Sequence, residues 1–210
     1  MIVDIVEVSH AGVLHDVSLT LAAAELAVLA GRSGSGKTTL CHLIAGIMPP
    51  SGGRVSVNDR PAHSVKDWAE VSLLPQRLAL DPELTVAENV LLPAGLRGRP
   101  AETDLLDRLG LTPIAGRPAR DTSVGEQQRT AIARALVLAP AVAVLDEPTA
   151  HQDDEHVQLV LDVLVEAVRA GTLAVVATHD PRVIEIAGRT VHLRSGRVVT
   201  SGPDRTGPGA

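Results

Sequence analysis

The sequence predicts an α/β fold, in which a mostly parallel sheet is joined by a small antiparallel β part and an inserted α-helical subdomain. Short apolar runs of strand character alternate with helical patterns at both ends of the chain, as in strand–helix–strand units. Between about residues 78 and 139 helical patterns take over. We therefore expect an α/β core from residues 1–77 and 140–200, a helical subdomain at 78–139, and a disordered Gly/Pro-rich tail at 201–210.

The first 77 residues supply five predicted strands and one helix. A compact apolar run that ends in glycine, residues 26–30, is typical of a strand buried on both faces. The helix begins at Lys37 and stops near residue 45, because Gly46 follows it and two prolines stand just beyond. The other strands are expected at residues 2–8, 17–21, 54–57 and 71–74, the first two antiparallel to the rest.

The remaining elements follow from the same patterns. In the subdomain we expect Pro/Gly-rich turns and helices, the turns at residues 93–100 and 111–118 and the helices at 85–92, 102–109 and 125–138. The core then resumes with strands at 141–145 and 173–177 and helices at 154–170 and 181–187. A hairpin around Ser195–Gly196, with strands at 190–194 and 197–200, completes it.

Composition narrows the class of protein. The chain has 210 residues, 45% of them apolar and 21% charged, so it can bury a core as one large domain or two small ones. A net charge of −6 argues against a nucleic-acid partner. The single cysteine, Cys41, cannot form an internal disulfide, which fits a reducing compartment. No signal peptide is visible and the apolar runs are too short to span a bilayer, so any role at a membrane is expected to require a partner.

A glycine-rich loop carries the clearest chemistry in the sequence. Residues 31–39 read GRSGSGKTT, which fits G-x-x-x-x-G-K-[ST], and they stand between a predicted strand and a predicted helix. In such a loop, backbone amides and a helix N-terminus surround phosphate oxygens. Lys37 is expected to reach the β- and γ-phosphates, and the Thr38 hydroxyl to ligate Mg²⁺. The predicted phosphate-binding residues are Gly31, Ser33, Gly34, Ser35, Gly36, Lys37, Thr38 and Thr39.

Two carboxylates follow the predicted strand at residues 141–145. Asp146 stands at the strand tip, where the acid of a phosphate-loop core meets the Mg²⁺. Because the chain turns there, Glu147 can also reach the site and orient the attacking water. Without the glycine-rich loop, an Asp-Glu-Pro turn would indicate only an ordinary loop. Together the two segments predict the hydrolysis of a nucleoside triphosphate.

Further segments resemble motifs of the nucleotide-binding domain of ABC transporters, in that family's order. Residues 122–129, TSVGEQQR, resemble the signature LSGGEQQR, and residues 150–153, AHQD, resemble the D-loop. Gln76 matches the Q-loop glutamine, and His179 matches the switch histidine. The resemblance covers nearly the whole chain and implies a P-loop NTPase core that binds and hydrolyses ATP with Mg²⁺.

The resemblance also implies a role for each matching residue. Gln76 would contact Mg²⁺ or the water, so it joins Thr38 and Asp146 as a metal residue. His179 would contact the γ-phosphate. The expected catalytic residues are therefore Glu147, His179, Gln76 and Lys37.

An assembly is implied as well. In this family two subunits dock head to tail, and each ATP lies between the phosphate loop of one chain and the signature segment of the other. Ser123 and Gly125 would then contact the ATP of the second chain in a homodimer or heterodimer. Ser123 and Glu126 also form an S-x-x-E capping box, which starts a helix in any protein. A membrane permease is the implied partner, which would hold the chain at the cytoplasmic face of the cell membrane, and no nucleic acid is expected.

The sequence departs from the family pattern at three places. Val124 stands where the signature has glycine, and its β-branched side chain either holds the partner surface off or points away. Gln152 replaces the usual leucine of the D-loop. Where the family stacks adenine on an aromatic ring, residues 8–13 contain no aromatic residue and His10 is the only ring nearby, so weak discrimination between ATP and GTP is expected.

Two other functions remain open at this stage. A soluble ABC ATPase that acts on nucleic acid or ribosomes would usually carry two cassettes, a long coiled coil or a basic arm, which this sequence lacks. A regulatory cassette with little hydrolysis is favoured by Val124, whereas Lys37, Asp146, Glu147 and His179 favour an active ATPase. The form of the signature and the short length resemble exporters of the lipoprotein-release and macrolide-efflux type, but neither cargo nor direction can be read from the chain.

Overall fold

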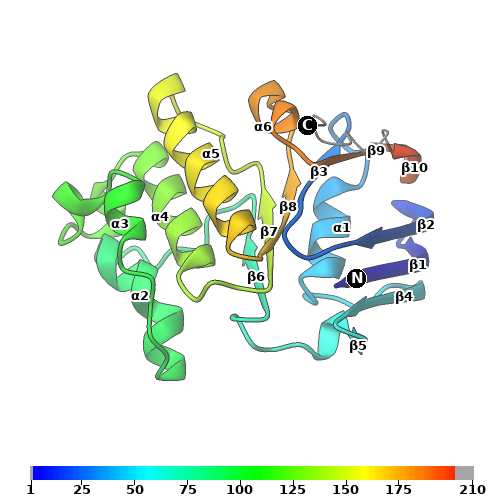
Figure 1. The fold of residues 1–210 in the computed structure, drawn as a ribbon, viewed down its shortest axis with the longest axis horizontal. Coiled ribbons are helices and arrows are strands. Elements are labelled where there is room, and N and C mark those ends of the chain that lie inside the picture. Colours follow the sequence, from blue (N-terminus) through cyan, green and yellow to red (C-terminus); the bar gives the residue numbers. More distant parts are fainter. Residues whose placement is uncertain (1, 202–210) are drawn as a thin grey trace, which may run out of the picture.

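A six-stranded sheet forms the centre of the molecule, which is a computed structural model that describes residues 2–201 (Figure 1). In spatial order its strands are β10 (Arg197–Ser201), β9 (Arg189–Arg194), β3 (Leu26–Ala30), β8 (Leu173–Ala177), β7 (Val142–Asp146) and β6 (Val71–Leu74). Strands β9 to β6 are parallel, and β10 forms an antiparallel hairpin with β9. Strands β3, β7 and β8 are buried along their whole length, as expected for parallel strands covered on both faces.

A four-stranded antiparallel sheet forms the second β part. Its order is β2 (Leu14–Leu21), β1 (Val3–His10), β4 (Gly52–Val57) and β5 (Arg60–Pro61). Strand β1 ends later and β2 begins earlier than predicted, because the chain turns only at Ala11 and Gly12, where φ is 47° and 68°. These left-handed conformations let His10 pair with Leu14 across the turn.

Helix α1 (Lys37–Ile44) lies between the two sheets (Figure 1). It begins after the glycine-rich loop that follows β3 and ends where Gly46 takes φ 69°. A Cβ at Gly46 would lie 2.2 Å from the Ala62 carbonyl oxygen, so both the backbone conformation and the close approach require glycine there. The buried side chains of α1 join one apolar cluster with both sheets, and they are Leu40, Cys41, Leu43 and Ile44.

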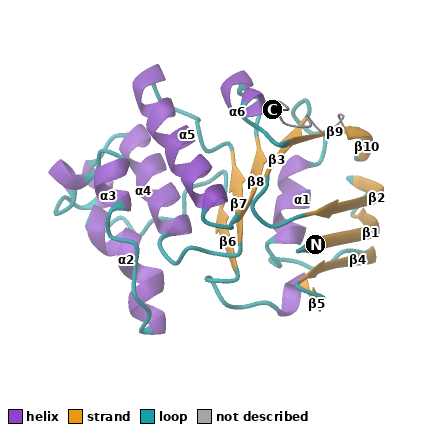
Figure 2. Cartoon of the chain, in the orientation of Figure 1, coloured by secondary structure: helices purple, strands orange, loops and turns teal. Residues whose placement is uncertain are grey.

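Helices cover the opposite face of the six-stranded sheet (Figure 2). Helices α5 (Asp154–Arg169) and α6 (Pro181–Glu185) follow β7 and β8 and lie against the sheet. Helix α4 (Val124–Leu136) packs beside α5, with α2 (Val86–Arg97) and α3 (Leu105–Arg108) outside it. Helices α2, α3 and α4 all fall within residues 78–139, the stretch predicted to be a helical insertion. Short 3₁₀ turns occur at Ala62–Ser64, Thr112–Ile114 and Ala119–Asp121.

Two predictions for the helical part are wrong. The turn expected at residues 93–100 is mostly helix, because α2 continues through Pro93 and ends at Gly98 with φ 58°. Pro93 is buried on the same helical face as Val90, so packing outweighs the hydrogen bond that a proline cannot make. The helix expected at 102–109 is limited to α3, which begins after Asp104 and ends at Arg108.

Parallel pairing brings the carboxyl ends of β3, β7 and β8 to one edge of the sheet. The glycine-rich loop follows β3, Glu147 follows β7, and His179 lies just beyond β8. Segments far apart in sequence therefore meet at this edge, where open α/β sheets bind their ligands.

None of the helices between residues 2 and 201 is both long enough and apolar enough to cross a membrane. The tail predicted at 201–210 lies outside the described residues, apart from Ser201 at the end of β10.

Candidate active site

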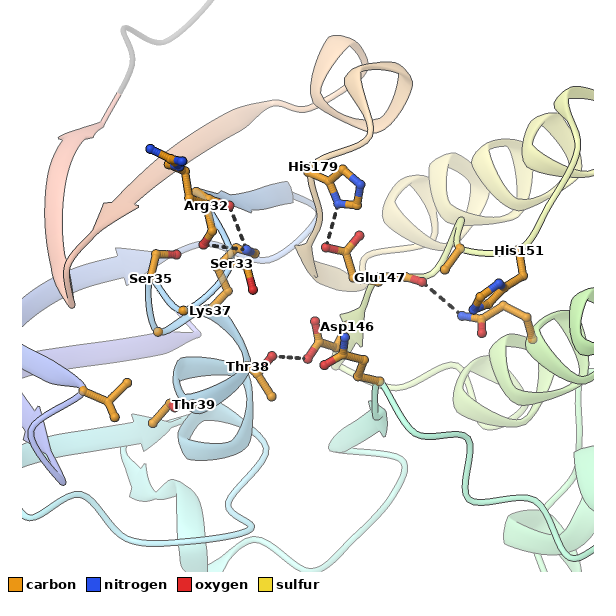
Figure 3. Close-up of a pocket in the computed structure, with 17 residues that line it drawn as sticks. Arg32, Ser33, Ser35, Lys37, Thr38, Thr39, Asp146, Glu147, His151 and His179 are labelled. Atoms are coloured by element: carbon orange, nitrogen blue, oxygen red, sulfur yellow. Dashed lines mark hydrogen bonds and ion pairs between the residues drawn. The ribbon is translucent and has the colours of Figure 1, made fainter.

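A cavity of about 710 Å³ opens at the sheet edge where β3, β7 and β8 end (Figure 3). We call it the phosphate-loop cavity. All predicted site residues line it except Ser123 and Gly125. Its lining residues are Val13, Gly31, Arg32, Ser33, Gly34, Ser35, Gly36, Lys37, Thr38, Thr39, Gln76, Gln128, Asp146, Glu147, Ala150, His151 and His179.

The glycine-rich loop, residues 31–36, takes its shape from glycine at two kinds of position. Gly34 has φ 77° and no heavy atom within 4 Å of the place of a Cβ, so this residue leaves space open at the loop. Gly31 has φ 157°, and a Cβ there would lie 2.4 Å from the Leu193 carbonyl oxygen of β9. A side chain would therefore be strained at Gly34 and would clash with β9 at Gly31.

Lys37 is the first residue of α1, and its ammonium lies over the loop. Nζ donates to the carbonyl oxygens of Gly31, at 2.8 Å, and Arg32, at 3.4 Å (Figure 3). The first turn of α1 contains no acidic side chain. A helix N-terminus and one ammonium together make a positive region suited to phosphate oxygens.

Thr38 and Asp146 join the loop to the tip of β7. Thr38 Oγ1 donates a 2.6 Å hydrogen bond to Oδ2 of Asp146 (Figure 3). Asp146 is buried, which raises the pKa of its carboxyl group, and the hydrogen bond from Thr38 opposes that rise. A buried carboxylate of this kind is stabilised by a nearby cation.

This pair of oxygens fits magnesium. Among residues 2–201 no cluster of three or more His, Cys, Asp or Glu side chains could hold a metal ion by itself. Mg²⁺ is commonly bound by one or two carboxylates together with substrate phosphates and water. The Thr38 hydroxyl and the Asp146 carboxylate are hard oxygen donors at hydrogen-bond distance, so they suit a metal that a phosphate also binds.

Glu147 is held by two residues from the end of β8. Its Oε2 accepts a 3.0 Å hydrogen bond from Thr178 Oγ1, and its Oε1 lies 3.0 Å from Nδ1 of His179. The φ angle of Glu147 is 52°, which is uncommon for a residue other than glycine. Its amide donates to the Ala177 carbonyl at 2.8 Å, and such contacts maintain the strained backbone. The carboxylate is thereby fixed at the cavity wall (Figure 3).

Two glutamines from other elements reach the same cavity. Gln76 follows β6 and lines the wall. Gln128 is a buried residue of α4, and its Nε2 donates to the carbonyl oxygens of Glu147, at 3.1 Å, and Pro148, at 3.4 Å. Helix α4 is thus tied to the turn that carries Glu147.

The predicted signature segment forms the N-terminus of α4. Ser123 accepts a hydrogen bond from the Glu126 amide, and the Glu126 carboxylate accepts one from the Ser123 amide, so the predicted capping box is confirmed. Val124 follows with 54% of its surface exposed. Ser123 and Gly125 do not line the cavity of their own chain. A site completed by a second chain requires that separation.

The glycine-rich loop is also supported by Gly196, for which the sequence predicted only a turn. The amide of Gly196, between β9 and β10, donates to the Ser35 carbonyl at 3.1 Å, and its carbonyl accepts from the His15 amide at 2.9 Å. A Cβ at Gly196 would lie 2.0 Å from the Val13 carbonyl oxygen. The C-terminal hairpin therefore holds the glycine-rich loop from behind.

Other residues of the site and its support were not predicted, among them Thr178, Gln128 and Val13. Thr178 and Gln128 each stand inside or beside a segment that was recognised, and their positions there were the available signal. Val13, rather than the ring of His10, lines the cavity. His10 Nδ1 instead lies 3.4 Å from Oγ of Ser51.

Comparison with known sequences shows which proteins share these features. Residues 14–150 match the family described as ABC transporter. The chain is 40% identical over 198 residues to the ABC transporter ATP-binding protein YtrE of Bacillus subtilis (strain 168). The aligned region covers 88% of this chain and 86% of YtrE. It is also 40% identical over 208 residues to the lipoprotein-releasing system ATP-binding protein LolD of Anaeromyxobacter dehalogenans (strain 2CP-C), covering 92% and 87%.

Two solved structures share the fold. One is a dimeric post-hydrolysis state of the ATP-binding cassette MJ0796 bound to ADP and Pi, with a TM-score of 0.88. The other is a dimeric structure of MJ0796, a bacterial ABC transporter cassette, with a TM-score of 0.86. Both are 27% identical to this chain, and each comparison covers 98% of this chain and 99% of the other.

Proposed function

Because the chain belongs to the ABC transporter family, we propose that its phosphate-loop cavity binds ATP with Mg²⁺ and that the residues described above share the hydrolysis between them. The chain is the ATP-binding and ATP-hydrolysing subunit of an ABC transporter, as the sequence predicted. The observation that supports the residue assignments is the convergence of Lys37, the Thr38–Asp146 pair and Glu147 on one cavity.

The triphosphate is bound by the glycine-rich loop and the start of α1. Lys37, which spans the loop through its bonds to Gly31 and Arg32, exchanges those carbonyl oxygens for β- and γ-phosphate oxygens. Thr38 Oγ1 and Asp146 Oδ2 are the protein oxygens that would hold Mg²⁺, with Gln76 on the same wall. The metal supplies positive charge that neutralises the phosphate oxygens.

Hydrolysis is assigned to the group around Glu147. Its carboxylate orients a water for in-line attack on the γ-phosphorus and accepts a proton from it, while the bond to the leaving ADP oxygen breaks. Thr178 and His179 hold the two oxygens of that carboxylate, so the attacking water meets a fixed acceptor. His179, with 83% of its side chain exposed, is proposed also to contact the γ-phosphate at the cavity mouth.

A second chain completes each site in this proposal. Ser123 and Gly125 of one chain contact the ATP bound by the other, which accounts for their position outside their own cavity. MJ0796 forms cassette dimers, and LolD is named for a lipoprotein-releasing system. We propose that this chain likewise dimerises on ATP and drives a membrane permease, which holds it at the inner face of the cell membrane.

Hydrolysis measured on three chains tests the assignments. The wild type should release phosphate from ATP only with Mg²⁺ present. Lys37→Ala should lose nucleotide binding, because the cavity loses the ammonium proposed to meet the β- and γ-phosphates, whereas Glu147→Gln should keep binding and lose turnover. Equal turnover in wild type and Glu147→Gln would remove Glu147 from the catalytic role. Binding without turnover in the wild type would favour a regulatory cassette.

A further inference from the structure

A hydrogen-bonded clasp joins the first turns of α4 to the segment between β7 and α5. Gln152 lies in that segment and is half-buried. Its Nε2 donates to the Gly125 carbonyl at 2.9 Å, and its Oε1 accepts from Nη1 of Arg129 at 2.7 Å. The amide nitrogen and the amide oxygen of Gln152 therefore both form hydrogen bonds with α4.

The backbones also meet closely at this point. A Cβ at Gly125 would lie 2.9 Å from the His151 carbonyl oxygen and 3.6 Å from the amide atoms of Gln152. Gly125 has no left-handed φ, so its role here is to allow the close approach. The signature turn of α4 is therefore pressed against residues 151–152.

Arg129 explains why the side chain at position 152 is polar. The guanidinium is buried, and burial lowers the pKa of Arg129, an effect that Glu126 and Asp153 oppose through their charge. Its Nε donates to the Leu109 carbonyl at 2.9 Å, and Gln152 accepts from Nη1. An apolar side chain at 152 would leave that Nη1 group without this acceptor, which is costly for a buried charge.

We propose that Gln152 is a positioning residue, which fixes the signature turn of α4 relative to the turn that carries Glu147. Gln128 supplies the second tie, through the Glu147 and Pro148 carbonyls, so α4 is held at two points along residues 147–152. The consequence for catalysis rests on the proposed function. A fixed signature turn presents Ser123 and Gly125 to the ATP of a second chain, and a loosened one weakens ATP-dependent dimerisation.

Gln152→Met tests the proposal, because methionine keeps the length of the side chain and removes both hydrogen bonds. Gln158→Met is the matched control, since Gln158 lies exposed on α5 and bonds only to Asp162 among the hydrogen bonds described for it. In the nucleotide-free chain, amide hydrogen exchange across residues 123–130 should be about tenfold faster in Gln152→Met. Exchange in α5 should stay as in the wild type, and the control should change neither region.

Turnover provides the second measurement. The protein concentration that gives half-maximal ATPase activity should rise about tenfold in Gln152→Met. The kcat at saturating protein and the affinity of the single chain for nucleotide should stay within about twofold of the wild type. If Gln152 only stabilised the fold, Gln152→Met would lower the melting temperature. It would not raise the half-maximal protein concentration while leaving kcat and nucleotide affinity unchanged.

Gln152→Glu keeps the test valid if the methionine variant does not fold. Glutamate preserves the acceptor for Arg129 but places an oxygen against the Gly125 carbonyl, so exchange across 123–130 should be faster than in the wild type. Wild-type exchange and wild-type concentration dependence in the variants would overturn the proposal. Faster exchange in a protein whose wild type hydrolyses no ATP would instead overturn the proposed function and leave the positioning role intact.

Discussion

Nδ1 of His179 lies 3.0 Å from Oε1 of Glu147, although the two residues belong to different strand ends. Thr178 bonds the other carboxylate oxygen, so both oxygens of Glu147 contact residues that directly follow β8. The orientation of the proposed water-activating group is therefore set by the neighbouring strand as much as by β7, which carries it. A change at Thr178 should then alter catalysis without touching the phosphates.

Thr178→Val should reduce kcat for ATP hydrolysis by about tenfold to a hundredfold, since valine has the same shape but cannot hold Oε2 of Glu147. The Asp180 amide, which donates to Thr178 Oγ1 at 3.0 Å, would lose its acceptor as well. Thr172→Val is the control, because buried Thr172 donates to the Pro140 carbonyl at 2.8 Å away from the cavity. It should cost stability of about 1 kcal/mol with kcat unchanged. Equal kcat losses in both variants would contradict the assignment.

Asp146→Asn should stabilise the nucleotide-free protein at pH 7 and abolish Mg²⁺-dependent hydrolysis. Burial raises the folded-state pKa of Asp146 above its unfolded value, so the charged carboxylate lowers stability at neutral pH. Its favourable contribution is complete below the unfolded pKa, about 3.9, and is lost as the pH rises through the folded pKa. The melting temperature at pH 7 should therefore be higher in Asp146→Asn than in the wild type.

Thermal unfolding as a function of pH checks the sign of this effect. The gain from Asp146→Asn should shrink as the pH falls through the folded-state pKa of Asp146, and it should vanish below the unfolded pKa, about 3.9. Asparagine still offers an oxygen to the Thr38 hydroxyl, so the hydrogen bond does not confuse the comparison. A variant less stable than the wild type at pH 7 would show that the burial of the charge is compensated.

Val13→Tyr should tighten the binding of ATP. Val13 lines the cavity with 39% of its surface exposed, and no aromatic residue occurs among residues 8–13. Base–aromatic stacking contributes about 1–3 kcal/mol, so an increase in affinity of roughly fivefold or more is expected. In the wild type, GTP and ATP should compete almost equally for the site. A strong preference of the wild type for ATP would refute this reading of the base site.

Val124→Gly should strengthen ATP-dependent dimerisation. Val124 is exposed at the first position of α4, beside Ser123, where the proposed second-chain contact forms. Removing the branched side chain lets the partner surface approach more closely. The protein concentration for half-maximal ATPase activity should fall, while the nucleotide affinity of the single chain stays constant. An unchanged concentration dependence would mean that Val124 points away from the partner.

The sequence predicted the parts of the site that depend on strict local spacing. The glycine-rich loop and Asp146 were recognised because each stands at the end of a recognisable buried strand, whereas His179 was recognised through its match to a family motif. The capping box at Ser123 was found for the same kind of reason, since it is local to four residues. The course of α2 was predicted wrongly at Pro93, because tertiary packing on the face shared with Val90 outweighed a local helix-breaking signal.

What could not be predicted depends on contacts between distant segments. Thr178 reaches Glu147 only because β7 and β8 are neighbours in the sheet. The sequence showed only that Gln152 departs from the D-loop pattern. The role proposed for it follows from its hydrogen bonds to Arg129 and Gly125, which only the structure shows. Pairings of this kind are set by topology rather than by spacing along the chain.

The contact of Gly196 with Ser35 has a consequence for biosynthesis. By residue 179 a ribosome has made every recognised motif of the cavity, but the turn that braces the loop has not yet been translated. A nascent chain at that length therefore carries a complete set of ATP-binding motifs without the brace behind them. Competence to hold nucleotide should appear only after the hairpin of β9 and β10 has been translated and has folded onto the sheet.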